Sequence, residues 1–272
     1  MSKLVLIEKK DYVAHVRLNR PDKYNALSPE MFEAITKAGQ SLAEDKSIRS
    51  VVLSGEGRGF CAGLDFQRFA EMQAKEKSED KNVKADLFGG VSETIANRAQ
   101  LVAYIWKQVP VPVIAALHGV SYGGGLQIAL GADIRLASPD ATFSVMEVKW
   151  GLVPDMSGTQ TLRDLLRLDV AKELAFTGRI INAKDAAELG LITRVCDDPL
   201  KEAQELAEEI VGKSPHAVAA CKHLFEEAWH GDSADGLKLE EKLQRSLIGS
   251  HNNVEAVMAN FEKRPPKYQD RE

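Results

Sequence analysis

Two short glycine-containing segments of the chain each follow a run of β-branched and apolar residues. Residues 59–65 read GFCAGLD, and residues 121–127 read SYGGGLQ. Glycine leaves backbone N–H groups unobstructed, and converging N–H groups stabilise a negative oxygen as it develops. The two segments therefore indicate acyl chemistry. Glu147 and Asp155, in the segment EVKWGLVPD, add two carboxyl groups that can transfer protons.

The glycines also have a simpler interpretation, because most glycine-rich turns are only tight turns. Neither segment has the GxGxxG spacing of a dinucleotide site, and the chain contains no GxxxxGK[S/T] phosphate loop. A helix is predicted at residues 126–131, so Gly124 would lie where free amides and the positive end of the helix dipole meet a ligand. That position favours the amide of Gly124 as an oxyanion donor.

Glu147 and Asp155 have a competing interpretation as a helix N-cap and a surface charge, which are the usual roles of acidic residues. Glu147, however, follows a predicted strand, and Asp155 stands just before a predicted helix start at SGTQTL. The chain has no HExxH motif, no tight cluster of His and Cys, and no EF-hand loop, so we expect no metal. It also lacks GxSxG, the strongest signature of a serine hydrolase.

The composition excludes several classes of protein. The 272 residues carry a net charge of −5, which gives no excess of Lys or Arg for binding nucleic acid or anionic lipid. A polyphosphate group would need a local basic patch. The 3 cysteines have no CxxC and no close spacing, which argues against a disulfide framework and predicts a reducing, cytoplasmic location. The N-terminal apolar stretch is too brief for a signal peptide, and no segment reaches membrane-spanning length.

Strands and helices alternate over the first part of the chain. A helix is predicted at residues 28–45, with Ser28 as its N-cap and apolar residues at helical spacing. A strand, a helix and another strand in this order predict a parallel sheet with crossover helices. We expect one α/β core over residues 1–197. Dense β-branched and aliphatic runs predict its strands at residues 4–7, 13–18, 50–54, 111–117, 133–137 and 142–145.

Two regions depart from this alternation. Residues 71–86 carry charges of both signs and few large apolar groups, which favours a solvated helix or a mobile loop over a lid above a nearby site. Residues 198–272 are predicted to form a helical region that packs on itself or on a neighbouring subunit. After residue 197 the chain shows only helical periodicity, at residues 200–213, 215–229, 236–248 and 253–261.

Four segments resemble successive signatures of the crotonase superfamily, the enoyl-CoA hydratase/isomerase proteins. They are RLNRPDKYNALS, GFCAGLD, PVPVIAALHGVSYGGGLQIALGADIRLAS and FSVMEVKWGLVPDMSGTQTL, and the match runs in order from the N-terminus to about Arg194. The resemblance implies an α/β, crotonase-like spiral of repeated ββα units with a C-terminal helical trimerisation region, often assembled as a hexamer. It also implies an acyl-CoA thioester substrate. CoA is then part of the substrate, and no separate cofactor is implied.

The family's oxyanion hole corresponds to the backbone amides of Leu64 and Gly124, which would hold the oxygen of a thioester enolate. Family members bind the CoA nucleotide near two segments of the core and through the C-terminal region of a neighbouring subunit. Lys23, Lys263 and Arg264 would supply the local cations for phosphates. Carried over to this sequence, the resemblance implies the substrate-binding residues Lys23, Ala26, Leu27, Ala62, Asp65, Gln127, Phe261 and Lys263.

Position 127 departs from the hydratases of this family, which carry one glutamate there and another at the position of Glu147. Gln127 can hold a water or a substrate group but cannot take up and return its proton, which speaks against two-glutamate hydration. Asp155 matches an aspartate of the dienoyl-CoA isomerases, whose Glu and Asp have the same eight-residue offset. Those isomerases usually carry another Asp where Gln127 stands. A hydroxyacyl-CoA hydrolase branch shares the Glu and Asp pair as well.

We therefore expect an enzyme of fatty acid metabolism, β-oxidation in particular, that isomerises a double bond in an enoyl- or dienoyl-CoA. Glu147 and Asp155 would transfer protons on opposite sides of the acyl chain, while the amides of Leu64 and Gly124 hold the enolate oxygen. Hydration, which is a lyase reaction, and hydrolysis of a hydroxyacyl-CoA thioester are alternatives. A catalytically silent acyl-CoA- or RNA-binding member is the alternative from another class, and the acidic charge balance argues against it.

Overall fold

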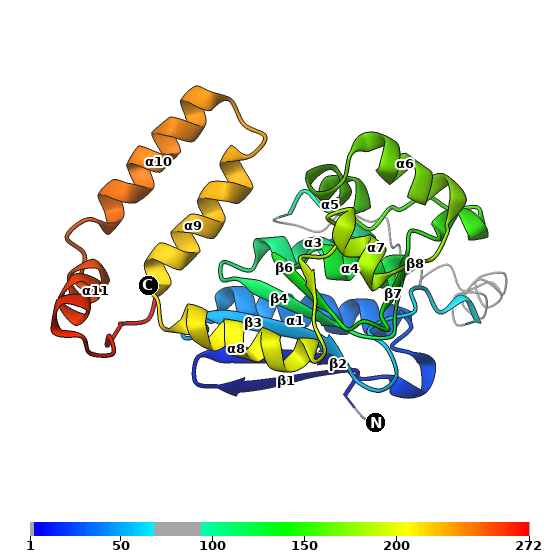
Figure 1. Ribbon diagram of the computed structural model, residues 1–272, viewed down its shortest axis with the longest axis horizontal. Coiled ribbons are helices and arrows are strands. Elements are labelled where there is room, and N and C mark those ends of the chain that lie inside the picture. The colour runs from blue at the N-terminus through cyan, green and yellow to red at the C-terminus, as the bar shows by residue number, and fades with distance from the viewer. Residues whose placement is uncertain (1–2, 68–93, 272) are drawn as a thin grey trace, which may run out of the picture.

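The computed structural model describes residues 3–67 and 94–271, and Figure 1 labels its helices and strands. The charged segment at residues 71–86, predicted to be a solvated helix or mobile loop, lies outside the described residues. Within the two described ranges, no helix has both the length and the apolar content that a membrane span requires.

The larger sheet has 6 strands in the order β1-β2-β3-β4-β6-β9. β1 and β2 are antiparallel, and the described pairings from β2 through to β9 are parallel. The predicted parallel sheet with crossover helices is therefore confirmed. Its strands are β1 Val5–Lys10, β2 Val13–Leu18, β3 Ser50–Gly55, β4 Val113–Leu117, β6 Ile134–Ala137 and β9 Arg194–Val195.

A second sheet of 3 strands, in the order β5-β7-β8, continues from the carboxyl end of β4. β5 pairs with β7 in parallel, and β7 pairs with β8 in antiparallel register. β5 and β8 were not predicted, because strands this short show no measurable alternation of apolar and polar residues. The strands are β5 Val120–Tyr122, β7 Thr142–Ser144 and β8 Ile181–Asn182.

Helices cover both faces of the larger sheet. Alternate residues of a strand point to opposite faces, so Val51 and Leu53 of β3 pack in one core cluster with residues of α1 and α3. Val52 packs on the other face against Ala203 and Ala207 of α8. This helix therefore covers the sheet as part of the core, although it follows the predicted boundary at residue 197. The core helices are α1 Pro29–Glu44, α3 Arg98–Gln108, α4 Gly124–Leu130, α5 Gly158–Leu165, α6 Leu168–Thr177, α7 Ala183–Glu188 and α8 Pro199–Val211, with two 3-10 turns, η1 Pro21–Lys23 and η2 Glu147–Trp150.

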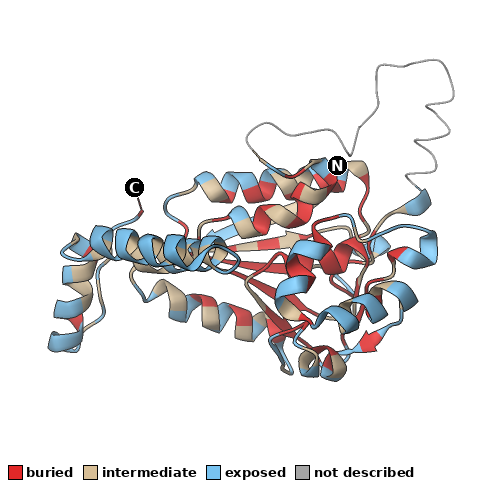
Figure 2. Ribbon diagram, turned by 90° about the horizontal axis from the view of Figure 1, so that it is seen from above, coloured by how far each residue is buried: buried red, intermediate tan, exposed pale blue. Residues whose placement is uncertain are grey.

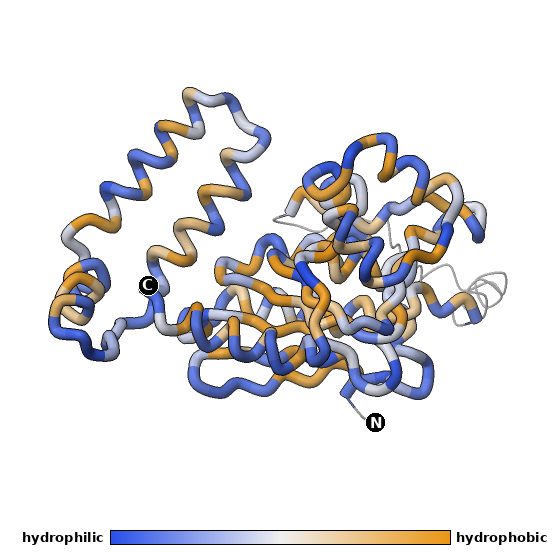
Figure 3. Tube along the Cα trace, viewed as in Figure 1, coloured by the Kyte–Doolittle hydropathy of each residue, from blue (hydrophilic) through white to orange (hydrophobic). Residues whose placement is uncertain are grey.

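The C-terminal region forms the predicted helices α9 Pro215–Ala228, α10 Ser233–Leu247 and α11 His251–Glu262. Figure 1 shows α9 and α10 side by side and extending away from the sheet, and Figure 2 shows most of this region exposed. Apolar positions nevertheless recur along these helices (Figure 3). The exposed large apolar side chains of this region are Phe225, Trp229, Leu237, Ile248, Val254, Val257, Met258 and Phe261.

One buried lysine attaches α9 to the core. Lys222 Nζ donates to the backbone oxygens of Trp106 and Val111 at 3.0 and 3.1 Å, and it forms a 2.8 Å ion pair with Asp133 Oδ2. The same Asp133 oxygen accepts from the N–H of Val113 at 2.7 Å, at the start of β4. Burial lowers the pKa of Lys222, and the charge of Asp133 opposes that shift.

Replacing this lysine should destabilise the protein, because the substitution leaves the Asp133 carboxylate without its charged partner and two carbonyls without the lysine donor. We expect Lys222→Met to lower the free energy of unfolding by about 3 kcal/mol, as breaking a buried ion pair usually does. Lys213→Met is the matched control, since Lys213 pairs with Glu209 at an exposed surface, 3.6 Å away, and should change stability by no more than about 0.5 kcal/mol. Urea unfolding measures both, and equal effects would contradict the role of Lys222.

Candidate active site

The two glycine segments predicted from the sequence lie side by side. The N–H of Cys61 donates to the oxygen of Val120, and the N–H of Tyr122 donates to the oxygen of Cys61, both at 3.0 Å. Gly63 then turns with a φ of 86°. A Cβ at Gly63 would lie only 2.7 Å from the oxygen of Tyr122 and 3.6 Å from the nitrogen of Gly124. Only glycine permits this approach of the two turns.

Two amides at this junction are free to bind a ligand. Within the described residues, no acceptor meets the N–H of Leu64 or the N–H of Gly124. Leu64 is held from both sides, because Leu27 donates to the oxygen of Gly63 at 2.8 Å and Asp65 donates to the oxygen of Leu27 at 3.0 Å. Gly124 is the first residue of α4, where helix amides have no partner within the helix. The structure thus brings the two predicted oxyanion donors together on adjacent turns.

Asn25 holds the first glycine segment, which begins at Gly59, in place. Its side-chain nitrogen donates to the oxygens of Glu56, Gly59 and Phe60, each at 3.0 Å, and its oxygen accepts from the N–H of Arg20 at 2.7 Å. Asn25 has a φ of 56°, a left-handed conformation that asparagine tolerates better than most residues. Its role was missed in the sequence, where the only signal was an asparagine beside a turn in RLNRPDKYNALS.

Asp65, expected from the resemblance to bind substrate, forms a 2.7 Å ion pair with Arg20. The same Arg20 nitrogen donates to the oxygen of Ala26 at 3.0 Å. Asp65 therefore ties the turn that carries the Leu64 amide, called the oxyanion turn below, to the segment before α1. Arg20 is a further supporting residue that was not anticipated.

Glu147 lies beside the second glycine segment, residues 121–127. A Cβ built at Gly123 would be 3.4 Å from Glu147 Oε1, so the carboxyl group adjoins the residue before Gly124. Glu147 is only 8 % exposed, and its Oε1 accepts from Gln127 Nε2 at 2.6 Å. Its Oε2 is buried with no partner among the described residues. Burial raises the pKa of Glu147, the hydrogen bond from Gln127 lowers it, and the charge of Asp155 raises it further.

Asp155 lies on the loop between η2 and α5. The residue is exposed, yet desolvation by the surrounding protein atoms raises the pKa of its carboxyl group. Because the charge of Asp155 contributes to the raised pKa of Glu147, the two carboxyl groups are electrostatically coupled. The structure therefore combines two free amides with two carboxyl groups whose pKa values are moved toward neutral pH, which suits proton transfer.

The other expected substrate residues fall into two groups. Lys23 is exposed at the end of η1, while Ala26 and Ala62 are half-buried near the oxyanion turn. Leu27 is buried, and its Cδ1 would lie 3.0 Å from a Cβ at Gly124. Phe261 and Lys263, which are exposed, belong to α11 and the residue after it, and Figure 1 shows α11 at one end of the molecule, well apart from α4 and α5. Within one chain, therefore, Phe261 and Lys263 do not reach the carboxyl pair.

An aromatic contact that the sequence did not reveal spans the site. The rings of Phe66 and Trp150 lie 4.2 Å apart between centroids, at a tilt of 34°. Phe66 follows the Leu64 turn, and Trp150 ends the η2 turn that begins with Glu147. The contact joins the oxyanion turn to the η2 turn, and the two rings together form an apolar surface.

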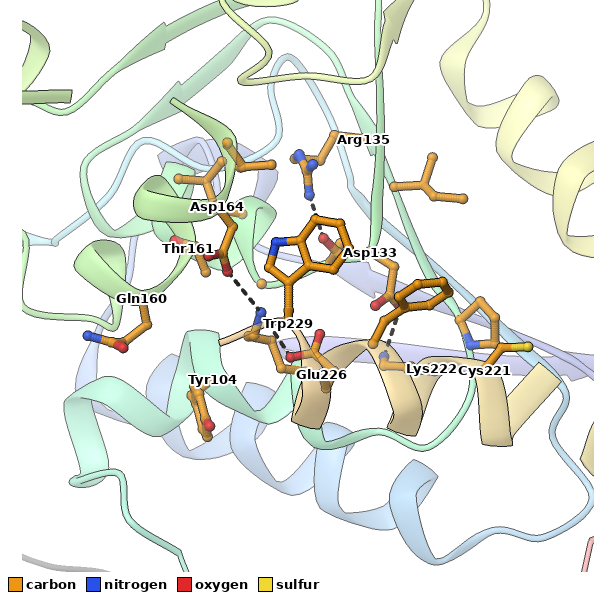
Figure 4. A pocket seen from close by; sticks show the side chains of 18 of the residues that line it. Tyr104, Asp133, Arg135, Gln160, Thr161, Asp164, Cys221, Lys222, Glu226 and Trp229 are labelled. Atoms are coloured by element: carbon orange, nitrogen blue, oxygen red, sulfur yellow. Dashed lines mark hydrogen bonds and ion pairs between the residues drawn. The ribbon is translucent and has the colours of Figure 1, made fainter. Parts of the chain in front are cut away.

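A cavity of about 730 Å³ lies between α9 and the core (Figure 4). Most of its ionisable side chains pair with each other, Lys222 with Asp133, Lys107 with Glu226 and His230 with Asp164, while Arg135 donates to the backbone oxygens of Ala132 and Leu191. Neither the carboxyl pair nor the two free amides line it. This cavity is separate from the candidate active site. In the part of the chain that the structure describes, no cluster of His, Cys, Asp and Glu could hold a metal ion.

Comparison with known proteins agrees with this geometry. A family model described as enoyl-CoA hydratase/isomerase matches residues 8–271. The chain is 33 % identical to mitochondrial methylglutaconyl-CoA hydratase of Mus musculus over 258 residues, which are 92 % of this chain and 77 % of that protein. It is 32 % identical to the short-chain-enoyl-CoA hydratase of Clostridium acetobutylicum, over 96 % of this chain and 95 % of that protein.

The fold leads to the same family. The crystal structure of an enoyl-CoA hydratase from Mycobacterium smegmatis superposes with a TM-score of 0.81 and 31 % identity, covering 98 % of this chain and 99 % of that one. An enoyl-CoA hydratase from Bacillus anthracis gives a TM-score of 0.84 at 29 % identity, over 97 % and 98 % of the two chains. The expected crotonase-like α/β fold is thereby confirmed. The chain belongs to the crotonase superfamily, as a member of the enoyl-CoA hydratase/isomerase family of acyl-CoA enzymes.

Proposed function

We propose that this enzyme moves a carbon–carbon double bond within an enoyl- or dienoyl-CoA. The observation that carries the proposal is the pairing of Glu147 and Asp155 beside two free amides, where burial raises the pKa of both carboxyl groups. At position 127 the chain offers an amide, which cannot accept and return a proton. The acid–base groups available at this site are therefore Glu147 and Asp155.

In this scheme the thioester oxygen accepts hydrogen bonds from the amides of Leu64 and Gly124. One carboxylate removes a proton from a carbon of the acyl chain, and the electron pair of the broken C–H bond moves into the conjugated system. The negative charge that develops on the thioester oxygen is stabilised by the two amides. The other carboxyl group then donates its proton to a carbon further along the chain, so the double bond has moved and no atom is gained or lost. CoA carries the acyl group, and the scheme uses no further cofactor.

Hydration of a 2-enoyl-CoA is the second candidate, because both named relatives, from Mus musculus and Clostridium acetobutylicum, are hydratases. In that reaction Glu147 and Asp155 would orient and activate water in place of the two glutamates of the family's hydratases.

The free thiols of Cys61, Cys196 and Cys221 support the proposal of a reducing compartment, and we propose the cytoplasm as the location of the enzyme.

We also propose that the chain assembles as a trimer or a hexamer through α9, α10 and α11. Apolar side chains on these helices are exposed in one chain, Phe261 being 81 % exposed, and contiguous exposed apolar surface usually marks an interface. Assembly would also let Phe261 and Lys263 of one subunit reach the CoA at the site of another, where the ammonium group of Lys263 would pair with the phosphates.

A substitution at Gly124 tests the oxyanion donor. Gly124→Pro removes the N–H, whereas Gly124→Ala adds a Cβ and keeps the N–H. Both added carbons would meet Met156 Sδ and Leu27 Cδ1, the movable ends of side chains, at 2.6 and 3.0 Å. Because loss of one oxyanion donor costs a factor of roughly 100 to 1000, kcat of the proline variant should fall that far below kcat of the alanine variant. Equal kcat values in the two folded variants would show that this glycine serves only the turn.

The reaction itself is tested with purified protein and a panel of 2-enoyl-, 3-enoyl- and dienoyl-CoA substrates. We expect double-bond migration, and we expect Glu147→Gln and Asp155→Asn each to lower kcat by roughly 100- to 10,000-fold with little change in KM, because the amides keep shape but exchange no proton. Rapid hydration without any migration would instead establish the second candidate. Full activity in Asp155→Asn would exclude proton transfer by this residue.

Light scattering at micromolar concentration tests the assembly. We expect a mass of three or six chains, and the double variant Phe261→Ser, Met258→Ser should shift it toward one chain, since both side chains are exposed on α11. Exposed apolar residues of the core, such as Leu168, provide the control Leu168→Ser, which should leave the mass unchanged. A single-chain mass for the unmodified protein would refute the proposal.

A further inference from the structure

Gln127 makes three hydrogen bonds inside the candidate active site. The residue is 2 % exposed and lies on α4, within one turn of Gly124. Its Nε2 donates to Glu147 Oε1 at 2.6 Å. Its Oε1 accepts from the N–H of Met156 and from the N–H of Gly158, both at 2.9 Å.

These partners fix the orientation of the amide. Two backbone N–H groups can be met only by the amide oxygen, so the amide nitrogen must face the carboxyl group. The oxygen reaches its donors because residue 158 is glycine: a Cβ at Gly158 would lie 2.6 Å from Gln127 Oε1. The arrangement thus requires at position 127 a side chain with one donor side and one acceptor side, which the amide of Gln127 provides.

The first consequence concerns Glu147. The hydrogen bond from Gln127 occupies Oε1, so Oε2 is the carboxyl oxygen that remains without a partner among the described residues. Gln127 therefore determines which oxygen of Glu147 is available to exchange a proton with a ligand.

The second consequence concerns the loop that carries Asp155. Met156 and Gly158, the two residues bound by the Gln127 oxygen, flank Ser157, which has a φ of 62°. A left-handed conformation at a non-glycine residue is unfavourable and persists only where neighbouring contacts hold it. Asp155 directly precedes this clamped segment, so the same amide sets the position of the second carboxyl group.

We propose that Gln127 is a positioning residue, which orients Glu147 and the Asp155 loop together from inside the protein and does not itself contact the substrate. This role rests on the proposed function, since it assigns Gln127 to the two groups that would transfer protons. It differs from the expectation, drawn from the family resemblance, that Gln127 binds substrate.

Gln127→Glu is the informative variant, because the two side chains have nearly the same shape. In its protonated form the introduced carboxyl group can donate to Glu147 Oε1 and accept from Met156 and Gly158, which reproduces the amide. In its ionised form it places a second negative charge at the 2.6 Å contact with Glu147. Repulsion between two carboxylates so close raises the second apparent pKa of the pair, and below that pKa the two groups share one proton. The charge of Asp155 acts on Glu147 in the same direction.

We expect kcat of Gln127→Glu to stay within about threefold of the unmodified enzyme at low pH and to fall roughly tenfold per pH unit above the second apparent pKa of the carboxyl pair, with KM little changed. Gln160→Glu is the matched control: Gln160 is exposed on α5, and among the described residues its side chain bonds only to the neighbouring Thr159, so the pH profile of this variant should match that of the unmodified enzyme. A profile of Gln127→Glu that matches the unmodified enzyme, or fast hydration that persists above that pKa, would overturn the positioning role.

A second readout does not depend on turnover. The carboxyl carbon of Glu147, assigned in carbon-13 NMR spectra by its loss in Glu147→Gln, can be titrated in each protein. We expect its apparent pKa to rise by at least about one unit in Gln127→Glu and to stay unchanged in Gln160→Glu. A shifted pKa without turnover of any acyl-CoA by the unmodified protein would refute the proposed function and keep the positioning role. Turnover of an acyl-CoA by the unmodified protein, with an unshifted pKa in Gln127→Glu, would keep the proposed function and refute the positioning role.

Discussion

The contact between two glycine turns is the constraint on which the rest of the site depends. The Gly63 and Gly123 turns approach so closely that a Cβ at Gly63 would lie 2.7 Å from the oxygen of Tyr122. Hydrogen bonds between Cys61 and the β5 strand use the neighbouring amides, which leaves those of Leu64 and Gly124 for a ligand. The parallel sheet makes this geometry possible, because the carboxyl ends of β3 and β4 meet at the same edge and deliver both turns there.

The carboxyl groups beside these turns show how the fold balances electrostatic costs. Burial destabilises the charged form of Glu147 and raises its pKa, while Gln127 returns part of that stabilisation through one hydrogen bond. The uncompensated Oε2 carries a cost of about 1 to 3 kcal/mol or more, as buried polar atoms without partners do. Such a cost is retained where an oxygen must remain available for chemistry. Glu147 is thus less stabilised than a structural carboxylate such as Asp65, which is neutralised by Arg20.

Local sequence signals predicted much of the fold and singled out a few residues of the candidate site. Apolar runs identified the strands of the larger sheet except the two-residue β9, and Ser28 marked the start of α1, where it accepts from the N–H of Met31. Gly124 could be singled out because a helix start follows its glycine run. The contacts of Gln127 could not, because its partners Met156 and Gly158 are 29 and 31 residues away and no periodicity links them. The same holds for the Asn25 contacts with the turn after β3 and for the Asp65 ion pair, which only the folded chain brings together.

The central claim is that the amides of Leu64 and Gly124 both bind the thioester oxygen of an acyl-CoA. Infrared difference spectroscopy of an enoyl-CoA with a carbon-13 label at the thioester carbonyl measures this most directly, because hydrogen bonds to a carbonyl oxygen weaken the C=O bond. On binding, the carbonyl band should move to lower frequency than in water, since two amides held in a site that excludes water polarise the carbonyl more strongly than solvent does. A band at or above its position in water, at saturating protein, would contradict the account.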